Sequence, residues 1–305
     1  MWKESIKSLD FMFYSWYMRI YLNNELNKFT SFKIGGIADV IAEPKDIKEL
    51  VELIKFLRKN YIKYYILGNG TNLLISDKGV RGCVVHIGSN LSSIKLNGNK
   101  IIAEAGALMK EISQFALKHN LGGFEELSGI PGSIGGATAM NAGAYGKEIK
   151  DLFSSANAIN ESGRVIKLTK DSMDFSNRKS SVFEKGYIIT SVTLGLQESK
   201  KEIISKNIEK FTSLRQKNQP LDYPSAGSVF KRPEGGYASL MIKNSNLMGE
   251  RIGDAEVSTL HAGFIVNRGK AKASDVYKLM NKIKDDVKTY FNVELEPEIK
   301  LWGKF

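Results

Sequence analysis

The feature that most restricts the fold of this chain is a glycine-dense segment, SGIPGSIGGATAMNAGAYG, at residues 128–146. Glycine adopts backbone angles that other residues avoid, and its missing side chain lets another group approach the main chain closely. So many glycines in one ordered region indicate unusual backbone angles or a close contact. The segment is therefore a candidate for contact between the main chain and a ligand.

A second glycine-containing stretch, GNGTNLL at residues 68–74, directly follows a predicted strand at 64–67. Gly68-x-Gly70 resembles the start of the Rossmann fingerprint, but Leu73 stands where the third glycine belongs, so that fingerprint fails. The chain also lacks the phosphate-binding loop Gly-x-x-x-x-Gly-Lys-Ser/Thr. Alone, the stretch is explained at least as well by a tight turn. Two such stretches, about sixty residues apart, could hold one dinucleotide from opposite sides through their backbone N–H groups.

Hydrophobic periodicity indicates three blocks of mixed helices and strands, without an internal repeat or a low-complexity linker. The first block contains a helix at 45–60 and the strand at 64–67. The second contains helices at 109–119 and about 200–217, and strands at 84–87, 101–105, 165–168 and 187–196. Its last helix places on one face Ile204, Ile208, Phe211 and Leu214.

The third block begins near residues 219–220 and contains a helix that Ser274 can cap. The core face of this helix is predicted to consist of Val276, Leu279, Met280, Ile283 and Val287. Strands and helices mixed in this way, without a steady βαβ rhythm, predict an α+β fold.

The net charge of +11 and the pI near 9.4 suit a nucleic-acid partner, or ligands that carry phosphates and carboxylates. Basic residues are mixed with acidic ones, as in ESKKE at 198–202, so a solvated surface is the simpler interpretation. An RNA-binding protein, the alternative from a different functional class, would need clustered basic residues with interleaved aromatics. The sequence contains no such cluster.

Cys83 is the only cysteine of the chain, which excludes an internal disulfide and any multi-cysteine metal site. We expect no bound metal, and a reducing compartment is the simplest inference. The apolar stretch Phe11–Met18 is too short to span a bilayer and lacks a signal-peptide cleavage pattern. We interpret residues 1–26 as a helical segment that packs onto the body of the protein. We expect the protein to be cytoplasmic. Contact with a membrane surface or a partner is the alternative.

Eight motifs occur in an order that strongly resembles the UDP-N-acetylenolpyruvoylglucosamine reductase (MurB) family. They lie at residues 30–36, 68–74, 128–136, 141–146, 177–180, 226–233, 261–267 and 295–298. Together the motifs span roughly residues 27–303. Only about fifty positions separate Arg178 from Ser228, too few to include the tyrosine-bearing substrate loop of the longer branch. The shorter, second type of the family is therefore the better match, and what covers the substrate stays open.

The resemblance implies a FAD-binding fold of the vanillyl-alcohol-oxidase (PCMH) type in two subdomains, at residues 27–90 and 91–218. A C-terminal α+β substrate-binding domain would follow at 219–305, and its last residues could pack back on the first subdomain. The implied reaction uses NADPH to reduce FAD, which passes hydride to the enolpyruvyl double bond of a UDP-sugar. The product, UDP-N-acetylmuramate, serves bacterial peptidoglycan synthesis. The expected partners are the UDP-sugar and NADPH, without nucleic acid or a membrane span, and the chain is expected to be a monomer.

The resemblance also implies which residues bind the ligands. FAD would lie between the two glycine-containing loops, and its expected ligands are Gly68, Asn69, Gly70, Thr71, Asn72, Leu73, Pro131, Gly132, Ser133, Gly136, Asn141 and Gly143. Lys231 and Arg232 are expected to meet the UDP phosphates, and His261 occupies a substrate-contacting position. The simpler interpretation of Lys231 and Arg232 is an exposed basic pair. That of His261 is a buried histidine whose hydrogen bonds are satisfied within the protein.

Three residues carry over from the family as catalytic: Arg178, Ser228 and Glu298. Hydride addition pushes negative charge into the enolpyruvyl carboxylate, where a guanidinium such as that of Arg178 would stabilise it. Glu298 would help to polarise this group if protonated, which requires a raised pKa in a dry site. Ser228 matches the family's proton donor to the carbanion-like centre.

Two positions depart from the family pattern without removing a catalytic group. Asn177 stands where a tyrosine commonly precedes the catalytic arginine, and Arg232 stands where some members have asparagine. The alternative within the same fold is a FAD-dependent oxidase of a small alcohol or hydroxy acid. The set of Arg178, Ser228 and Glu298 argues against that alternative.

Overall fold

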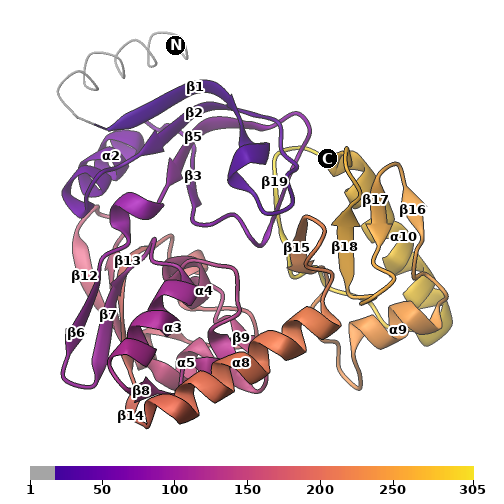
Figure 1. The fold of residues 1–305 in the computed structure, drawn as a ribbon. Coiled ribbons are helices and arrows are strands. Elements are labelled where there is room, and N and C mark those ends of the chain that lie inside the picture. Colours follow the sequence, from indigo (N-terminus) through magenta and orange to yellow (C-terminus); the bar gives the residue numbers. More distant parts are fainter. Residues whose placement is uncertain (1–17) are drawn as a thin grey trace. The chain divides into compact units, whose positions relative to one another are not determined.

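The computed structural model describes residues 18–305 (Figure 1). The helix predicted for residues 1–17 lies outside the described residues. Residues 19–25 form strand β1 (Arg19–Glu25), so the prediction of a helical segment up to residue 26 is wrong for this part. The physical reason is a partner distant in sequence, because β1 is the edge strand of a sheet beside β2 (Ile37–Glu43). Ile20 packs against the same core as β2.

The described residues divide into two units, each with its own hydrophobic core. Unit 1 comprises residues 18–22, Val40–Asn69 and Gly82–Phe211. Unit 2 comprises Asn23–Asp39, Gly70–Arg81 and Thr212–Phe305. The units interleave along the chain, whereas the predicted domains are consecutive. Phe32, Ile34 and Leu74 explain this difference, since these early residues lie in the core formed by the C-terminal block.

Most of the first sheet belongs to unit 1, and its strand order is β1-β2-β5-β3. Strand β3 (Tyr64–Leu67) runs parallel to β5 (Val80–His86). Helix α2 (Ile47–Lys59) begins after Asp46, whose side chain accepts a hydrogen bond from the backbone N of Glu49. Its apolar face packs against the sheet through Leu50, Leu53, Ile54 and Leu57. The predicted helix at 45–60 and strand at 64–67 are confirmed.

The second sheet of unit 1 is antiparallel, in the order β12-β11-β13-β7-β6. Its strands are β6 (Ile94–Asn97), β7 (Lys100–Glu104), β11 (Phe153–Ile159), β12 (Val165–Thr169) and β13 (Ile188–Gly195). Helices α3 (Met109–Lys118) and α4 (Ile134–Ala139) contact this sheet. The strands predicted at 101–105, 165–168 and 187–196 and the helix at 109–119 are confirmed.

Short elements complete unit 1. They are η2 (Ser89–Leu91), β8 (Leu121–Gly122), η3 (Glu125–Leu127), β9 (Gly143–Ala144), β10 (Lys147–Glu148), α5 (Ile149–Leu152), α6 (Lys170–Met173), α7 (Ser181–Glu184) and β14 (Gln197–Glu198). Helix α8 (Lys201–Asn218) begins in unit 1 and ends in unit 2. The four residues predicted to share one face are all at least partly covered: Ile204 is buried, and Ile208, Phe211 and Leu214 are half-buried. The other faces carry charged residues that stay in water.

Unit 2 is built on a sheet in the order β15-β18-β17-β16, with antiparallel neighbours. Its strands are β15 (Ser225–Ser228), β16 (Arg251–Ile252), β17 (Ala255–Val257) and β18 (Phe264–Asn267). Helix α10 (Ala273–Phe291) packs against β16 and β17 and contacts α9 (Ala238–Asn244) (Figure 1). The predicted core face of α10 is confirmed, since all five of its residues are buried. The unit also contains η1 (Leu26–Phe29), and β19 (Lys300–Trp302) pairs in parallel with β4 (Leu73–Ile75).

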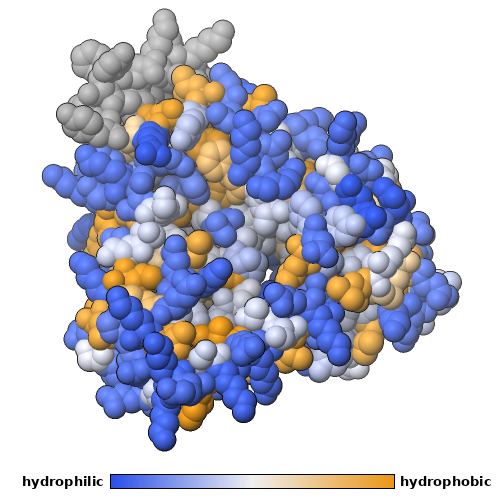
Figure 2. Space-filling view, viewed as in Figure 1, coloured by the Kyte–Doolittle hydropathy of each residue, from blue (hydrophilic) through white to orange (hydrophobic). Residues whose placement is uncertain are grey.

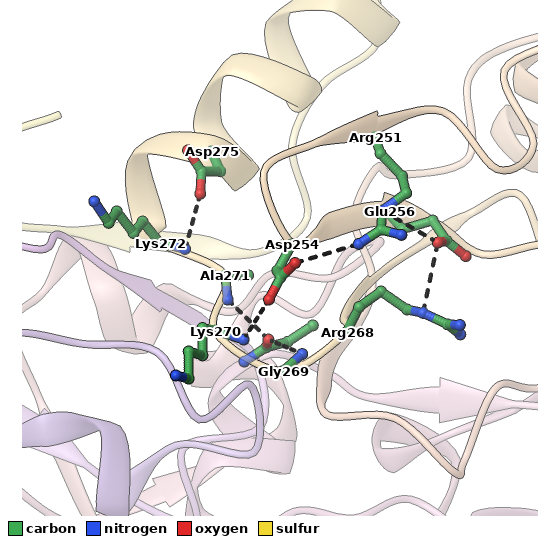
Figure 3. Close-up of polar contacts among 10 residues, drawn as sticks. Arg251, Asp254, Glu256, Arg268, Gly269, Lys270, Ala271, Lys272 and Asp275 are labelled. Atoms are coloured by element: carbon green, nitrogen blue, oxygen red, sulfur yellow. Dashed lines mark hydrogen bonds and ion pairs between the residues drawn. The ribbon is translucent and has the colours of Figure 1, made fainter.

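A polar network fastens the link between β18 and α10 to the β16–β17 hairpin (Figure 3). Asp254 accepts hydrogen bonds from the backbone N of Lys270 (2.9 Å) and from Arg251 Nη2 (3.2 Å). The buried Glu256 lies between two arginines, with its Oε2 3.6 Å from Arg251 Nε and 3.5 Å from Arg268 Nε. Two cations around one buried carboxylate compensate for its desolvation. The network therefore ties the segment before α10 to the hairpin.

The N-terminus of α10 differs from the sequence prediction. Its N-cap residue is Lys272, and Ser274 lies inside the first turn. The carboxylate of Asp77 accepts hydrogen bonds from the backbone N of Ala273 (2.7 Å) and of Ser274 (3.0 Å). A carboxylate from a distant loop thus accepts the hydrogen bonds of backbone N–H groups that a local N-cap side chain would otherwise accept.

Substitution of Asp77 by alanine is therefore expected to lower the free energy of unfolding by about 1–2 kcal/mol, the usual cost of losing a helix cap. Ser274→Ala is the control and is expected to change it by less than about 0.5 kcal/mol. Urea unfolding followed by circular dichroism measures both variants. Equal losses would show that Ser274, as the sequence suggested, shares the capping role.

On the face shown in Figure 2, hydrophilic residues cover most of the surface of each unit, and hydrophobic residues form small scattered groups. Within residues 18–305, no helix combines the length and the hydrophobicity that crossing a membrane requires.

Candidate active site

The two glycine-containing stretches meet within unit 1. Asn69 donates a hydrogen bond from its side-chain amide to the carbonyl of Pro131 (2.9 Å). A Cβ added to Gly68 would lie 2.6 Å from Ser133 Oγ, so the first stretch also passes close to the side chain of Ser133. The sequence prediction that the two stretches come together is confirmed for these residues. Their adjacent main chains form the kind of surface that holds a phosphate through backbone groups.

The second stretch is held in place by the segment that directly follows β7. Ser133 is the N-cap residue of α4, and the next two residues donate backbone hydrogen bonds to the carbonyls of Ala107 (2.8 Å) and Ala105 (2.9 Å). Pro131 and Gly136 are exposed, whereas Gly132 and Ser133 are buried. The stretch is therefore rigid on its inner side and presents part of its main chain to solvent.

Arg178 lies in a tight turn of unit 1. Ser176 and Lys179 exchange two backbone hydrogen bonds across this turn (3.0 and 3.3 Å). Arg178 has a φ of +55°, a left-handed backbone that costs a non-glycine residue about 1–2 kcal/mol. Its Nη2 donates to the carbonyl of Gly143 (3.1 Å), and its Nη1 lies 3.7 Å from Glu148 Oε1. The side chain is 25% exposed, so the guanidinium is fixed but still open to a ligand.

Ser228 and Glu298 are brought together in unit 2 by backbone pairing. Ser228 is the last residue of β15, and the next residue, Val229, donates to the carbonyl of Gly263 (2.9 Å). The backbone N of Glu298 donates to the carbonyl of Val229 (2.8 Å). Residues 70 positions apart in sequence are thus neighbours on adjacent segments, and both side chains are half-buried.

The end of the first glycine stretch is attached to the same segment of unit 2. Asn72 donates from its side-chain amide to the carbonyl of Glu298 (3.2 Å), and its own carbonyl accepts from the backbone N of Lys300 (2.9 Å). Ser31 adds a hydrogen bond from its Oγ to the carbonyl of Ser225 (2.7 Å). A residue expected to contact the cofactor therefore also holds the main chain of the residue that carries the expected catalytic carboxyl.

The two expected phosphate ligands are already engaged within unit 2. Lys231 Nζ forms an ion pair with Glu296, and the Lys231 side chain is 20% exposed. Arg232 stacks its guanidinium 4.1 Å above the ring centre of Tyr237 and donates from Nε to the carbonyl of Gly236 (3.2 Å). Arg232 is exposed and held flat on an aromatic ring. A phosphate at Lys231 would have to replace the carboxylate of Glu296.

His261 lies close to Ser228, because Phe264, in the strand β18 that follows His261, pairs with Ser228 in β15. Its Nδ1 accepts a hydrogen bond from the backbone N of Gly263 (3.1 Å), which places the ring proton on Nε2 in the neutral form. The ring packs edge-on against Phe264, with 5.0 Å between ring centres. Burial lowers the pKa of His261 below its ordinary value of 6.5, because the charged form loses solvation.

We expect His261 to make stability depend on pH. A lowered pKa in the folded state means that the unfolded chain binds more protons below about pH 6.5, so stability falls as the pH drops through this value. His261→Gln is expected to flatten this part of the stability profile, measured by urea unfolding between pH 5 and 8. The same slope in His261→Gln and the wild type would contradict the assignment.

The structure shows three polar partners that sequence reasoning missed: Glu148, Glu296 and Tyr237. Glu148 lies two positions after the GAYG motif, and Tyr237 follows a glycine pair, so their closeness to these motifs was the available signal. Glu148 contacts Arg178, and Glu296 contacts Lys231. Both partners lie far away in sequence, so no local pattern reveals these contacts.

The fold and the paired loops define a class, that of the FAD-binding proteins. Residues 38–169 match the family model described as FAD binding domain, which includes both glycine-containing stretches. The loops fit this dinucleotide, since the hydrogen bond from Asn69 to the carbonyl of Pro131 holds the two stretches side by side. Residues 219–302 match the model described as the C-terminal domain of UDP-N-acetylenolpyruvoylglucosamine reductase.

Similar proteins extend the match to nearly the whole chain. A protein named UDP-N-acetylenolpyruvoylglucosamine reductase from Caldanaerobacter subterraneus subsp. tengcongensis is 48% identical over 286 residues, 94% of each chain. One of the same name from Listeria innocua is 45% identical and covers 94% of this chain and 96% of its own. The crystal structure of the reductase from Thermus caldophilus superposes with a TM-score of 0.80 at 33% identity, covering 94% of this chain and 99% of that one.

The chain belongs to the UDP-N-acetylenolpyruvoylglucosamine reductase family. The predicted α+β fold class is confirmed, with a FAD-binding fold of the vanillyl-alcohol-oxidase type and a C-terminal α+β domain.

Proposed function

We propose that this chain uses NADPH and FAD to reduce the enolpyruvyl group of UDP-N-acetylglucosamine enolpyruvate, forming UDP-N-acetylmuramate for peptidoglycan synthesis. The observation that carries the proposal is the match of a FAD-binding domain and of this reductase's C-terminal domain on one chain. The identity of 48% to a reductase over 94% of both chains supports the same reaction.

FAD is the cofactor, and when bound it carries two electrons as a hydride from NADPH to the enolpyruvyl double bond. In unit 1, Gly68, Asn69, Pro131, Gly132, Ser133 and Gly136 would bind its phosphates through the main chain, with the main chain of Asn141 and Gly143 beside them. In unit 2, Gly70, Thr71, Asn72 and Leu73 would continue this set of ligands. The close approach of Gly68 to Ser133 supports this assignment.

Arg178, Glu298 and Ser228 would carry out the reduction of the substrate. Hydride addition to the CH₂ carbon turns the neighbouring carbon into a centre whose negative charge spreads into the carboxylate. The guanidinium of Arg178 would bind this carboxylate and stabilise the charge, and a protonated Glu298 would donate a hydrogen bond to it. Ser228 would then give its hydroxyl proton to the carbon and recover one from solvent.

Substrate binding is proposed for Lys231, Arg232 and His261. Lys231 would exchange the carboxylate of Glu296 for a phosphate oxygen of the UDP group, and Arg232 would bind a second one. His261, neutral at pH 7, would act as a hydrogen-bond partner and not as a cation. We further propose domain boundaries at residues 27–90, 91–218 and 219–305, a monomeric state, no nucleic-acid partner and a cytoplasmic location.

The state of Cys83 bears on the alternative of an oxidase with a covalently attached flavin. Cys83 is buried in β5, and burial raises the pKa of its thiol to about 12. Such a thiol stays protonated at neutral pH and is a poor nucleophile for a covalent bond to flavin.

The proposed reaction is tested by mixing the purified, yellow protein with NADPH and the enolpyruvyl UDP-sugar. We expect NADPH oxidation that requires the UDP-sugar and produces UDP-N-acetylmuramate. A protein that binds flavin but oxidises NADPH at the same rate without this substrate would reject the proposal. A colourless protein that binds RNA, with an affinity falling steeply as salt is added, would favour the different-class alternative.

A further inference from the structure

The side chain of Asn141 is hydrogen-bonded within unit 1 at each of its polar atoms. Its Nδ2 donates to Glu148 Oε2 (3.0 Å) and to the carbonyl of Ser176 (3.0 Å), and its Oδ1 accepts from the backbone N of Lys150 (3.0 Å). The residue is fully buried and has a φ of +43°. A hydrogen bond from the N–H groups of this amide to FAD would have to replace one of its two bonds to Glu148 and Ser176.

Both acceptors of the Asn141 amide lead to Arg178. Ser176 begins the tight turn that holds Arg178 in its left-handed conformation. Glu148 places its other carboxylate oxygen, Oε1, 3.7 Å from Arg178 Nη1. Lys150 Nζ also forms an ion pair with Glu148 Oε2 (2.7 Å), and this carboxylate raises the pKa of Lys150. One amide therefore connects the backbone and the side chain of the arginine.

Gly143 completes the support of the guanidinium. Its carbonyl accepts from Arg178 Nη2 (3.1 Å). A Cβ at this position would lie 2.7 Å from the carbonyl oxygen of Lys147 and 3.2 Å from Arg178 Nη1. Only glycine therefore lets the β9–β10 hairpin close beneath the arginine.

We propose that Asn141 is a positioning residue that orients the guanidinium of Arg178, and that it does not act as a side-chain ligand of FAD. Because the turn is strained, its geometry persists only where surrounding bonds fix it. The side-chain amide of Asn141 supplies such a bond at the start of the turn, and it holds Glu148 beside the guanidinium of Arg178. This inference rests on the proposed function, since it assumes that Arg178 binds the substrate carboxylate.

The test uses Asn141→Asp, which keeps the size of the side chain and its tolerance of a left-handed backbone but replaces both N–H donors by an acceptor. Flavin reduction by NADPH and flavin reoxidation by the enolpyruvyl UDP-sugar are measured separately by stopped flow. We expect reoxidation to slow about 10–100-fold, as misplacement of a reacting group by about 1 Å does. Reduction by NADPH should stay within about twofold of the wild-type rate.

A double-mutant cycle with Arg178→Lys shows whether Asn141 acts through the arginine. In that background, Asn141→Asp is expected to slow reoxidation less than about threefold, because a lysine has no fork to orient. Asn157→Asp, the same change on β11, is the matched control and should leave both half-reactions unchanged. Asn141→Gly, which also accepts the backbone angle, replaces Asn141→Asp if the latter does not fold, and the same results are expected.

Flavin retention is the readout that does not depend on activity. We expect Asn141→Asp to keep the FAD content of the wild type and the same rise in melting temperature when FAD is added. Loss of FAD with normal reoxidation of the remaining holoenzyme would make Asn141 a cofactor ligand and overturn the proposal. Equal slowing in both backgrounds would also overturn it. A wild type without substrate-dependent NADPH oxidation would instead reject the proposed function.

Discussion

Replacing Arg178 with alanine is expected to lower kcat for the enolpyruvyl UDP-sugar about 1,000-fold, the upper range for loss of one preorganised charge at a developing anion. The physical reason is that the carboxylate gains negative charge during hydride addition, and an alanine at position 178 supplies no positive charge to stabilise it. NADPH should still reduce the flavin at nearly the wild-type rate. Anaerobic stopped-flow measurement of the two half-reactions separates these effects.

Arg178→Lys is the matched variant, because it keeps the charge and loses the two-pronged geometry. We expect a loss of about 10–100-fold in kcat, between wild type and alanine. Both variants retain a Cβ and therefore the same left-handed strain, so neither should change stability much. An alanine variant that reoxidises its flavin as fast as the wild type would exclude Arg178 from the chemistry.

Replacing Ser228 with alanine is expected to slow flavin reoxidation by the enolpyruvyl UDP-sugar about 100–10,000-fold, the range for loss of a general acid. Reduction of the flavin by NADPH should be unaffected, because no proton from Ser228 enters that step. The reoxidation rate is measured by stopped flow after the flavin has been reduced with one equivalent of NADPH.

Ser225→Ala is the control for Ser228→Ala, since it removes a hydroxyl from the same strand, β15. We expect wild-type rates for both of its half-reactions. If Ser228→Ala slowed both half-reactions equally, the loss would reflect a general disturbance of the protein, and the proton-donor role would be wrong.

Local sequence patterns predicted many of the elements. The core face of α10 follows from the spacing of Val276, Leu279 and Met280, and the strand at 64–67 from its apolar run before a glycine turn. β1 could not be predicted in this way, because its strand conformation depends on pairing with β2. The cap of α10 by Asp77 was missed for the same reason, since the carboxylate comes from almost 200 positions away.

The residues of the candidate site were proposed from motif order, but their support was not. No pattern in the sequence indicates that Asn141 is fully bonded to Glu148 and to the turn of Arg178. Nor does it indicate that the backbone of Val229 lies between Gly263 and Glu298. Main-chain N–H and C=O groups are the same in nearly every residue, so their long-range pairing leaves no signature in the side chains.

By itself, the sequence determined the mixed α+β character, the two glycine-containing stretches and the residues able to handle a carboxylate and a proton. The fold character and the glycine stretches follow from periodicity and composition, which depend on neighbours along the chain, whereas the site residues follow from the resemblance of the motif order to the family. The tertiary structure alone decided the interleaving of the two units, the strained turn of Arg178 and the attachment of Glu298 to Asn72. Each of these depends on contacts between segments far apart in sequence, whose free energy exists only once the chain has folded.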